Sequence, residues 1–95
     1  MKLVRDNIPK IIQEKGKQPK THFAAGKEFE ESLIAKLEEE LKEIKQDRNV
    51  EEIADLIEVA YFLAKEYGAT EDEVNKLRKE KNSKNGSFEK KIILE

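Results

Sequence analysis

The segment from residue 53 to residue 64 constrains this chain most, because it is helical in pattern and almost entirely apolar. Ten of its twelve residues are apolar, and the two exceptions are Asp55 and Glu58. A helix that is apolar on most sides must be covered on most sides. On a helical wheel only one sector suits solvent, the one near Ala54, Glu58, Tyr61 and Lys65. The rest of a 95-residue chain cannot easily cover such a helix, so we expect a second subunit to bury part of it.

The remaining sequence predicts an all-α fold in a single domain, 1–95, built around a helical hairpin. Few glycines and prolines interrupt a chain rich in Glu, Lys, Leu and Ala, which favours long helices. The expected helices cover residues 9–15, 27–46, 50–67 and 71–83. On the second of them a stripe at helical spacing comprises Leu33, Ile34, Leu37, Leu41 and Ile44. The tail from Phe88 to Leu94 is expected to be a short strand or an extended arm.

Local signals place the ends of these helices. Asn49 is a suitable N-cap for the third helix, and Gly68 is a suitable residue just beyond its end. Thr70 and Glu73 are spaced as a capping box at the start of the fourth helix. The connections between the second, third and fourth helices are therefore short, which favours antiparallel packing of the second helix on the third.

The composition excludes several classes of function. Lys and Arg total 19 against 21 for Asp and Glu, a net charge of −2, whereas proteins that bind nucleic acids or anionic membranes usually carry a clear basic excess. The chain has no cysteine and a single histidine, which excludes the common zinc sites. The N-terminus has no apolar core of the kind that a signal peptide needs. The longest apolar stretch, residues 53–64, is about a third short of a membrane span. We expect a soluble, cytoplasmic protein without nucleic-acid or membrane partners.

Two carboxylates of the third helix occupy an unusual position for charged groups. Glu52 and Asp55 flank Val59 and Phe62 on the face that should be covered. Burying an unpaired carboxylate is expensive, so these groups need a cation or a hydrogen-bond partner. The alternative for glutamates in so acidic a chain is an ordinary solvated helix face.

The second helix carries a matching pair, Glu40 and Glu43, at the edge of its apolar stripe. Folding the two helices back near residue 48 brings Glu43 opposite Glu52 and Glu40 opposite Asp55. Carboxylate oxygens without His or Cys suit Mg²⁺ or Mn²⁺. Four carboxylates leave room for two ions.

These paired motifs resemble those of the all-α nucleoside triphosphate pyrophosphohydrolases, the MazG-like group that includes phosphoribosyl-ATP pyrophosphohydrolase. The segments 36–43 (KLEEELKE) and 52–56 (EIADL) follow in the order expected for that group. The opening 2–9 (KLVRDNIP) and the closing 85–94 (NGSFEKKIIL) are similar to those of a small predicted house-cleaning branch. The resemblance covers nearly the whole chain.

The resemblance implies Mg²⁺-dependent hydrolysis of a nucleoside triphosphate, canonical or noncanonical, to the monophosphate and pyrophosphate. Glu40, Glu43, Glu52 and Asp55 would then be the catalytic metal ligands, and the protein would be a homodimer or homotetramer. Three basic residues would bind the substrate: Arg5, Lys36 and Lys81. The residues themselves leave other roles open for two of these, because Arg5 also suits a structural ion pair and Lys81 a solvated helix face.

Two other function classes remain as alternatives. A helical protein-interaction module would use the same apolar faces, but it would give Glu52 and Asp55 no reason to lie on a covered face. A nucleotide sensor that binds without hydrolysis stays open as an alternative because of Asn7 and Asn85, which stand where the similar branch carries basic residues.

Overall fold

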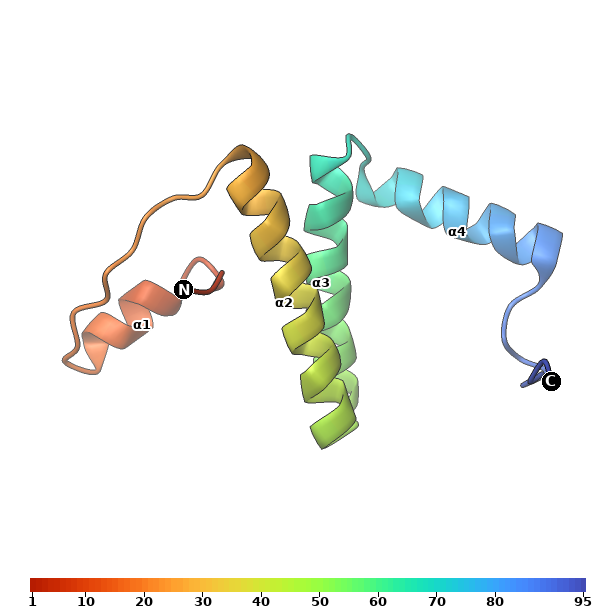
Figure 1. Cartoon of the computed structure of the whole chain (residues 1–95), viewed down its shortest axis with the longest axis horizontal. Helices are drawn as coiled ribbons and strands as arrows, with labels where there is room; N and C mark the ends of the chain where they lie inside the picture. Colours follow the sequence, from red (N-terminus) through yellow and green to blue (C-terminus); the bar gives the residue numbers. More distant parts are fainter.

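The structure, a computed structural model that describes residues 1–95, consists of four α-helices and contains no strand. Figure 1 shows them in chain order as α1 (Ile8–Glu14), α2 (Gly26–Asp47), α3 (Val50–Glu66) and α4 (Glu71–Asn85). The prediction of an all-α chain is confirmed, and each helix begins and ends within two residues of its predicted bounds. No helix has the length and apolar character needed to cross a membrane.

Helices α2 and α3 form an antiparallel hairpin at the centre of the molecule (Figure 1). The turn at its closed end needs only two residues, because Arg48 adopts the left-handed conformation with φ of 49°. Asn49 then caps α3, its side-chain oxygen accepting a hydrogen bond of 3.1 Å from the backbone N–H of Glu52. At the open end, a hydrogen bond with Glu30 raises the pKa of the Tyr67 hydroxyl.

The junction between α3 and α4 is closed by two local motifs. Gly68, with φ of 86°, donates its N–H to the Lys65 carbonyl at 3.0 Å, and Ala69 donates to the Ala64 carbonyl at 2.9 Å. This is a Schellman motif, which requires the left-handed conformation that glycine adopts without strain. Thr70 and Glu73 form the predicted capping box.

Packing within the hairpin uses one face of α2. Leu33 and Glu40 are the two buried residues of the chain, and Leu37 and Ile44 on the same face are half-buried. The predicted stripe on α2 is wrong in one respect, because Ile34 and Leu41 are exposed. They lie one residue beyond the positions that face α3, and a single partner helix is too narrow to cover both sides of the stripe.

Much of the apolar surface of α3 is uncovered in the single chain. Ile53, Ile57 and Phe62 are each at least 40% exposed. The predicted solvent sector is wrong at Tyr61, which is half-buried and whose hydroxyl donates a hydrogen bond of 3.1 Å to Asn75 of α4. The other three positions of that sector, Ala54, Glu58 and Lys65, are exposed as predicted.

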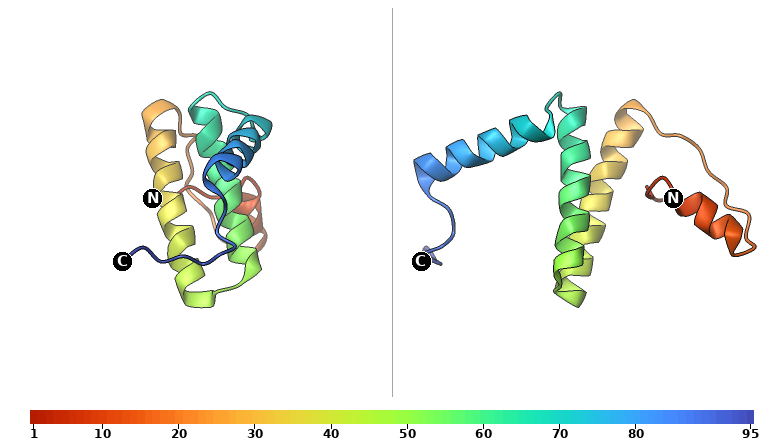
Figure 2. Two further views of the ribbon diagram at one scale, coloured as in Figure 1. Left: turned by 90° about the vertical axis from the view of Figure 1, so that its right-hand side faces the viewer. Right: turned by 180° about the vertical axis from the view of Figure 1, so that it is seen from behind.

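The whole chain is extended. Its radius of gyration is 16.8 Å, against about 12 Å for a compact domain of this length. Its accessible surface is 8714 Å², against about 5,600 Å² for a compact monomer of this mass. Helix α1 contacts no other helix and α4 contacts only α3, so both project from the hairpin on opposite sides (Figure 2). The tail after α4 is exposed and forms no strand. It bends at Phe88, turns at residues 89 and 90, and Lys91 adopts the left-handed conformation with φ of 56°.

Candidate metal centre

Two groups of carboxylates meet along the α2–α3 hairpin. The first contains Glu40, Glu52 and Asp55, and the second contains Glu43, Asp47 and Glu52. Within each group one oxygen of every carboxylate lies within 4.8 Å of the others. Because Glu52 belongs to both groups, the two form one continuous acidic cluster of five residues, which we call the carboxylate cluster.

Helical spacing explains this convergence. Glu40 follows Leu33 and Leu37 on the face of α2 that packs against α3, so its backbone position alone directs the side chain into the hairpin. Only 7% of Glu40 is exposed. On α3, Glu52 and Asp55 are three residues apart and half-buried, and they come from the first two turns after the Asn49 cap. In the hairpin, the i,i+3 pair on α3 therefore lies opposite acidic residues on α2.

The electrostatics of the cluster favour a cation. Partial burial raises the pKa of the Glu52 carboxyl, and the negative charges of its four cluster neighbours raise it further. The neighbours act in the order Glu43, Asp55, Asp47 and Glu40. Like charges this close oppose ionisation of one another, and a bound cation would relieve that repulsion.

Basic side chains border the cluster on one side. Arg5 Nη2 donates a hydrogen bond of 2.8 Å to Asp55 Oδ1. Lys36 Nζ lies 3.6 Å from Glu40 Oε1 and 3.3 Å from Glu39 Oε2. No lysine or arginine forms an ion pair with Glu43, Asp47 or Glu52. The negative charge of the cluster is thus compensated at Glu40 and Asp55 and uncompensated at Glu52.

A cavity of about 210 Å³ opens beside the cluster. Its polar lining comprises two cationic residues and four carboxylates: Arg5, Lys36, Asp6, Glu40, Asp55 and Glu58. Its apolar lining comprises Leu3, Val4, Phe29, Leu33, Val59 and Phe62. The cavity therefore places two cationic groups and an apolar wall next to the same carboxylates.

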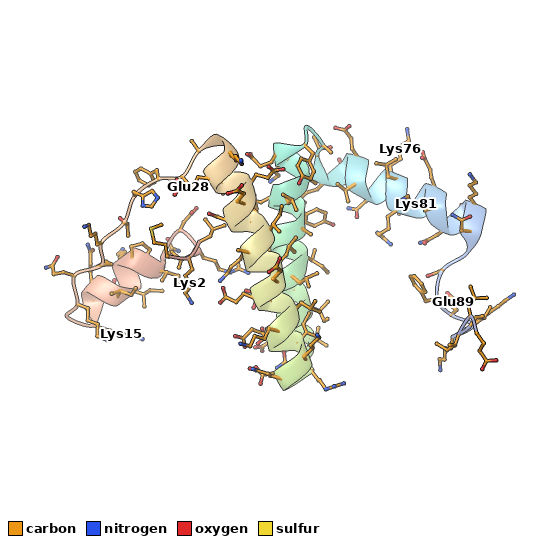
Figure 3. All side chains as sticks on the ribbon, viewed as in Figure 1. Lys2, Lys15, Glu28, Lys76, Lys81 and Glu89 are labelled. Atoms are coloured by element: carbon orange, nitrogen blue, oxygen red, sulfur yellow. The ribbon has the colours of Figure 1, made fainter.

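The structure brings together six of the seven residues singled out in the sequence. Glu40, Glu43, Glu52 and Asp55 lie in the cluster, and Arg5 and Lys36 form ion pairs with two of them. Lys81 is the exception, because it lies on α4, which projects away from the hairpin (Figure 3). Within one chain Lys81 does not reach this site.

Asp47 is a cluster member that the sequence reasoning missed. It lies at the last residue of α2, four residues after Glu43, and that i,i+4 spacing was the available signal. The expected turn at residues 47–49 placed Asp47 outside the helix, whereas α2 in fact continues through it.

The donor set fits a hard divalent cation. All five donors are carboxylates, and such oxygen-only sets are what Mg²⁺, Mn²⁺ and Ca²⁺ prefer. The two carboxylate groups of the cluster could each hold a metal ion.

No family model, curated protein or solved structure matches this chain significantly.

Proposed function

We propose that the chain is a Mg²⁺-dependent nucleoside triphosphate pyrophosphohydrolase, as its resemblance to the MazG-like group implies. The observation that carries the proposal is the convergence of Glu40, Glu52 and Asp55 in one group, with Glu43 joined to it through Glu52. These are the four residues that the resemblance assigns to the metal. They come from two helices and two separate sequence motifs. The folding of the hairpin, which brings them together, therefore supports the proposal in addition to the sequence motifs.

The neighbouring residues suit a triphosphate. Mg²⁺ held by the cluster would neutralise phosphate oxygens and activate a water for attack on the α-phosphorus. Arg5 and Lys36 line the cavity beside the cluster, where their charges can bind phosphate oxygens. The apolar wall with Phe29 and Phe62 can accept the nucleoside. One carboxylate of the cluster would accept the proton of the attacking water.

We also propose that the active protein is a homo-oligomer. The surplus of accessible surface over that of a compact monomer is about 3,000 Å² per chain. Obligate homodimer interfaces commonly bury about 2,000–5,000 Å² in total, so the uncovered faces of α3, α4 and the tail are sufficient for one. A dimer or tetramer would also give Lys81 a neighbouring chain whose site it could approach.

The test is pyrophosphate release by the wild-type protein and by three single variants, with Mg²⁺ and with EDTA. Glu52→Gln and Asp55→Asn should lower the Mg²⁺-dependent rate by at least about 100-fold, since even outer-shell partners of metal ligands are worth about 10–100-fold. The matched control is Glu51→Gln, an exposed residue in the same turn that belongs to neither group. It should keep the wild-type rate.

Circular dichroism of each variant separates loss of the site from loss of the fold. Wild-type rates in Glu52→Gln and Asp55→Asn would contradict the proposed site. A protein that is stabilised by Mg²⁺ and nucleotide without turnover would instead be a nucleotide sensor. The uncovered apolar faces also suit a helical interaction module, and a protein that neither Mg²⁺ nor nucleotide stabilises would favour that function.

A further inference from the structure

The N-terminal segment, residues 2–6, lies against the carboxylate cluster although the helix that follows it does not pack on the hairpin. Leu3 and Val4 are half-buried and line the cavity. Two ion pairs hold the segment to the hairpin, one between Arg5 and Asp55 and one between Lys2 and Glu39 at 3.6 Å. Figure 3 shows Lys2 in this position near α2. Arg5 thus attaches the segment to the cluster itself, whereas Lys2 attaches it to a residue outside the cluster.

The Arg5–Asp55 pair uses a carboxylate that also belongs to the first group of the cluster. Arg5 Nη2 lies 2.8 Å from Asp55 Oδ1, while an oxygen of Asp55 lies within 4.8 Å of Glu40 and Glu52 oxygens. A guanidinium and a divalent cation both carry positive charge, so they repel each other when they share one carboxylate. Full occupancy by both is therefore unfavourable.

We propose that Arg5 is an internal counter-ion of the carboxylate cluster, that a divalent cation displaces it from Asp55, and that the freed guanidinium then binds a phosphate group in the adjacent cavity. This inference rests on the proposed metal site. It assigns Arg5 two alternative partners, a carboxylate in the free protein and an anionic ligand in the loaded protein. The N-terminal segment moves with Arg5 between them.

The geometry makes this exchange feasible. The side chains of Arg5 and Asp55 are 61% and 39% exposed, and ion pairs as exposed as this are weak. A divalent cation with several carboxylate ligands can therefore displace the arginine. The planar guanidinium suits bidentate contact with phosphate, and Arg5 already lines the cavity together with Lys36.

The first experiment measures binding of Mn²⁺ without nucleotide, by the electron paramagnetic resonance signal of the free ion. The proteins are the wild type, Arg5→Gln and the matched control Lys2→Gln, whose partner Glu39 lies outside both groups. Arg5→Gln should bind Mn²⁺ about fivefold more tightly, because no ion pair must be broken first. Lys2→Gln should stay within about twofold of the wild type.

The second experiment measures binding of an α,β-methylene nucleoside triphosphate at saturating Mn²⁺ by calorimetry. Here Arg5→Gln should bind about tenfold more weakly, since a charged hydrogen bond to phosphate is lost. Arg5→Lys should recover part of that affinity. A merely structural role for Arg5 would change both affinities in the same direction, whereas the exchange changes them in opposite directions.

Circular dichroism first establishes that each variant is helical. Equal or weaker Mn²⁺ binding by a folded Arg5→Gln would overturn the exchange and leave the metal site intact. Unchanged nucleotide affinity in Arg5→Gln would overturn the second half of the inference. Absence of Mn²⁺ binding in all three proteins would overturn the proposed metal site, and the exchange with it.

Discussion

At the scale of single residues, Glu52 links the two halves of the carboxylate cluster and is the residue whose charge state matters most. Its pKa is raised by partial burial and by neighbouring carboxylates, so between the ordinary and the raised pKa the folded protein binds more protons than the unfolded chain. Folding stability without metal should therefore fall as the pH rises from about 4.3, the ordinary glutamate pKa, through the raised value.

Glu52→Gln should remove that dependence. The neutral amide does not titrate, so without metal the variant should melt at a higher temperature than the wild type at neutral pH, and its melting temperature should vary less between pH 4 and 7. Thermal denaturation followed by circular dichroism, with EDTA present, measures both effects. A wild-type protein that becomes more stable across this window relative to Glu52→Gln would contradict the pKa assignment.

A bound divalent metal should offset the loss of folding stability that ionisation of Glu52 causes. Metal ligands must be deprotonated, so metal binding competes with the proton on Glu52 and its affinity rises with pH through the raised pKa. Mg²⁺ at millimolar concentration should therefore raise the melting temperature of the wild type more at pH 7 than at pH 5. The Glu52→Gln protein should gain little at either pH, and an equal gain in both proteins would place the metal elsewhere.

The residue pairings differ in how far the sequence could predict them. Glu40, Glu52 and Asp55 were predictable because helical spacing and one short turn fix which faces of α2 and α3 meet. The Arg5–Asp55 pair joins residues 50 positions apart. The N-terminal segment that carries Arg5 has no hydrophobic periodicity. Nothing local in the sequence determines where such a segment lies, so active-site proximity and a structural ion pair stayed open as alternatives.

At the scale of helices, the cap of α3 positions the cluster because Glu52 lies in the first turn after Asn49. Asn49→Ala removes the hydrogen bond to the Glu52 N–H and should cost about 1 kcal/mol of folding stability. It should also weaken Mn²⁺ binding, because the first turn that carries Glu52 frays. Urea denaturation and metal titration measure the two effects.

The matched control for Asn49→Ala is Thr70→Ala, which removes the equivalent cap from α4. Its stability cost should also be about 1 kcal/mol, but α4 carries no residue of the cluster, so its Mn²⁺ affinity should equal that of the wild type. If both variants lost Mn²⁺ affinity equally, the loss would result from lower global stability, and the proposed link between the α3 cap and the cluster would be wrong.

The helices themselves were predictable because their ends carry local signals. Asn49, Gly68 and the Thr70–Glu73 box each act through backbone groups within a few residues. The tail was less predictable, because Phe88 and the residues 92–94 have strand-like side chains but no neighbouring strand to pair with. Without such a partner the tail forms no strand and is exposed.

At the scale of the whole molecule, the uncovered face of α3 predicts self-association. Ile57 is 44% exposed at the middle of that face, so we expect it to lie in the contact between subunits. Ile57→Lys should convert the oligomer to monomers, because burying an unpaired charge at such a contact costs several kcal/mol. Light scattering after size-exclusion chromatography measures the mass.

The control for Ile57→Lys is Ala54→Lys, an exposed position on the side of α3 that was predicted to face solvent. It should leave the mass unchanged. A wild-type protein that is monomeric at micromolar concentration would contradict the oligomer.

The directions of α1 and α4 could not be predicted from the sequence, because α1 packs on no helix and α4 contacts only α3.

Pyrophosphohydrolase-type cleavage by this chain is best tested by measuring the release of pyrophosphate from a panel of canonical and modified nucleoside triphosphates. We expect metal-dependent formation of pyrophosphate and the matching monophosphate from at least one of them, with Mg²⁺ or Mn²⁺ and not with EDTA. No release from any nucleotide by a folded protein that binds the metal would contradict it.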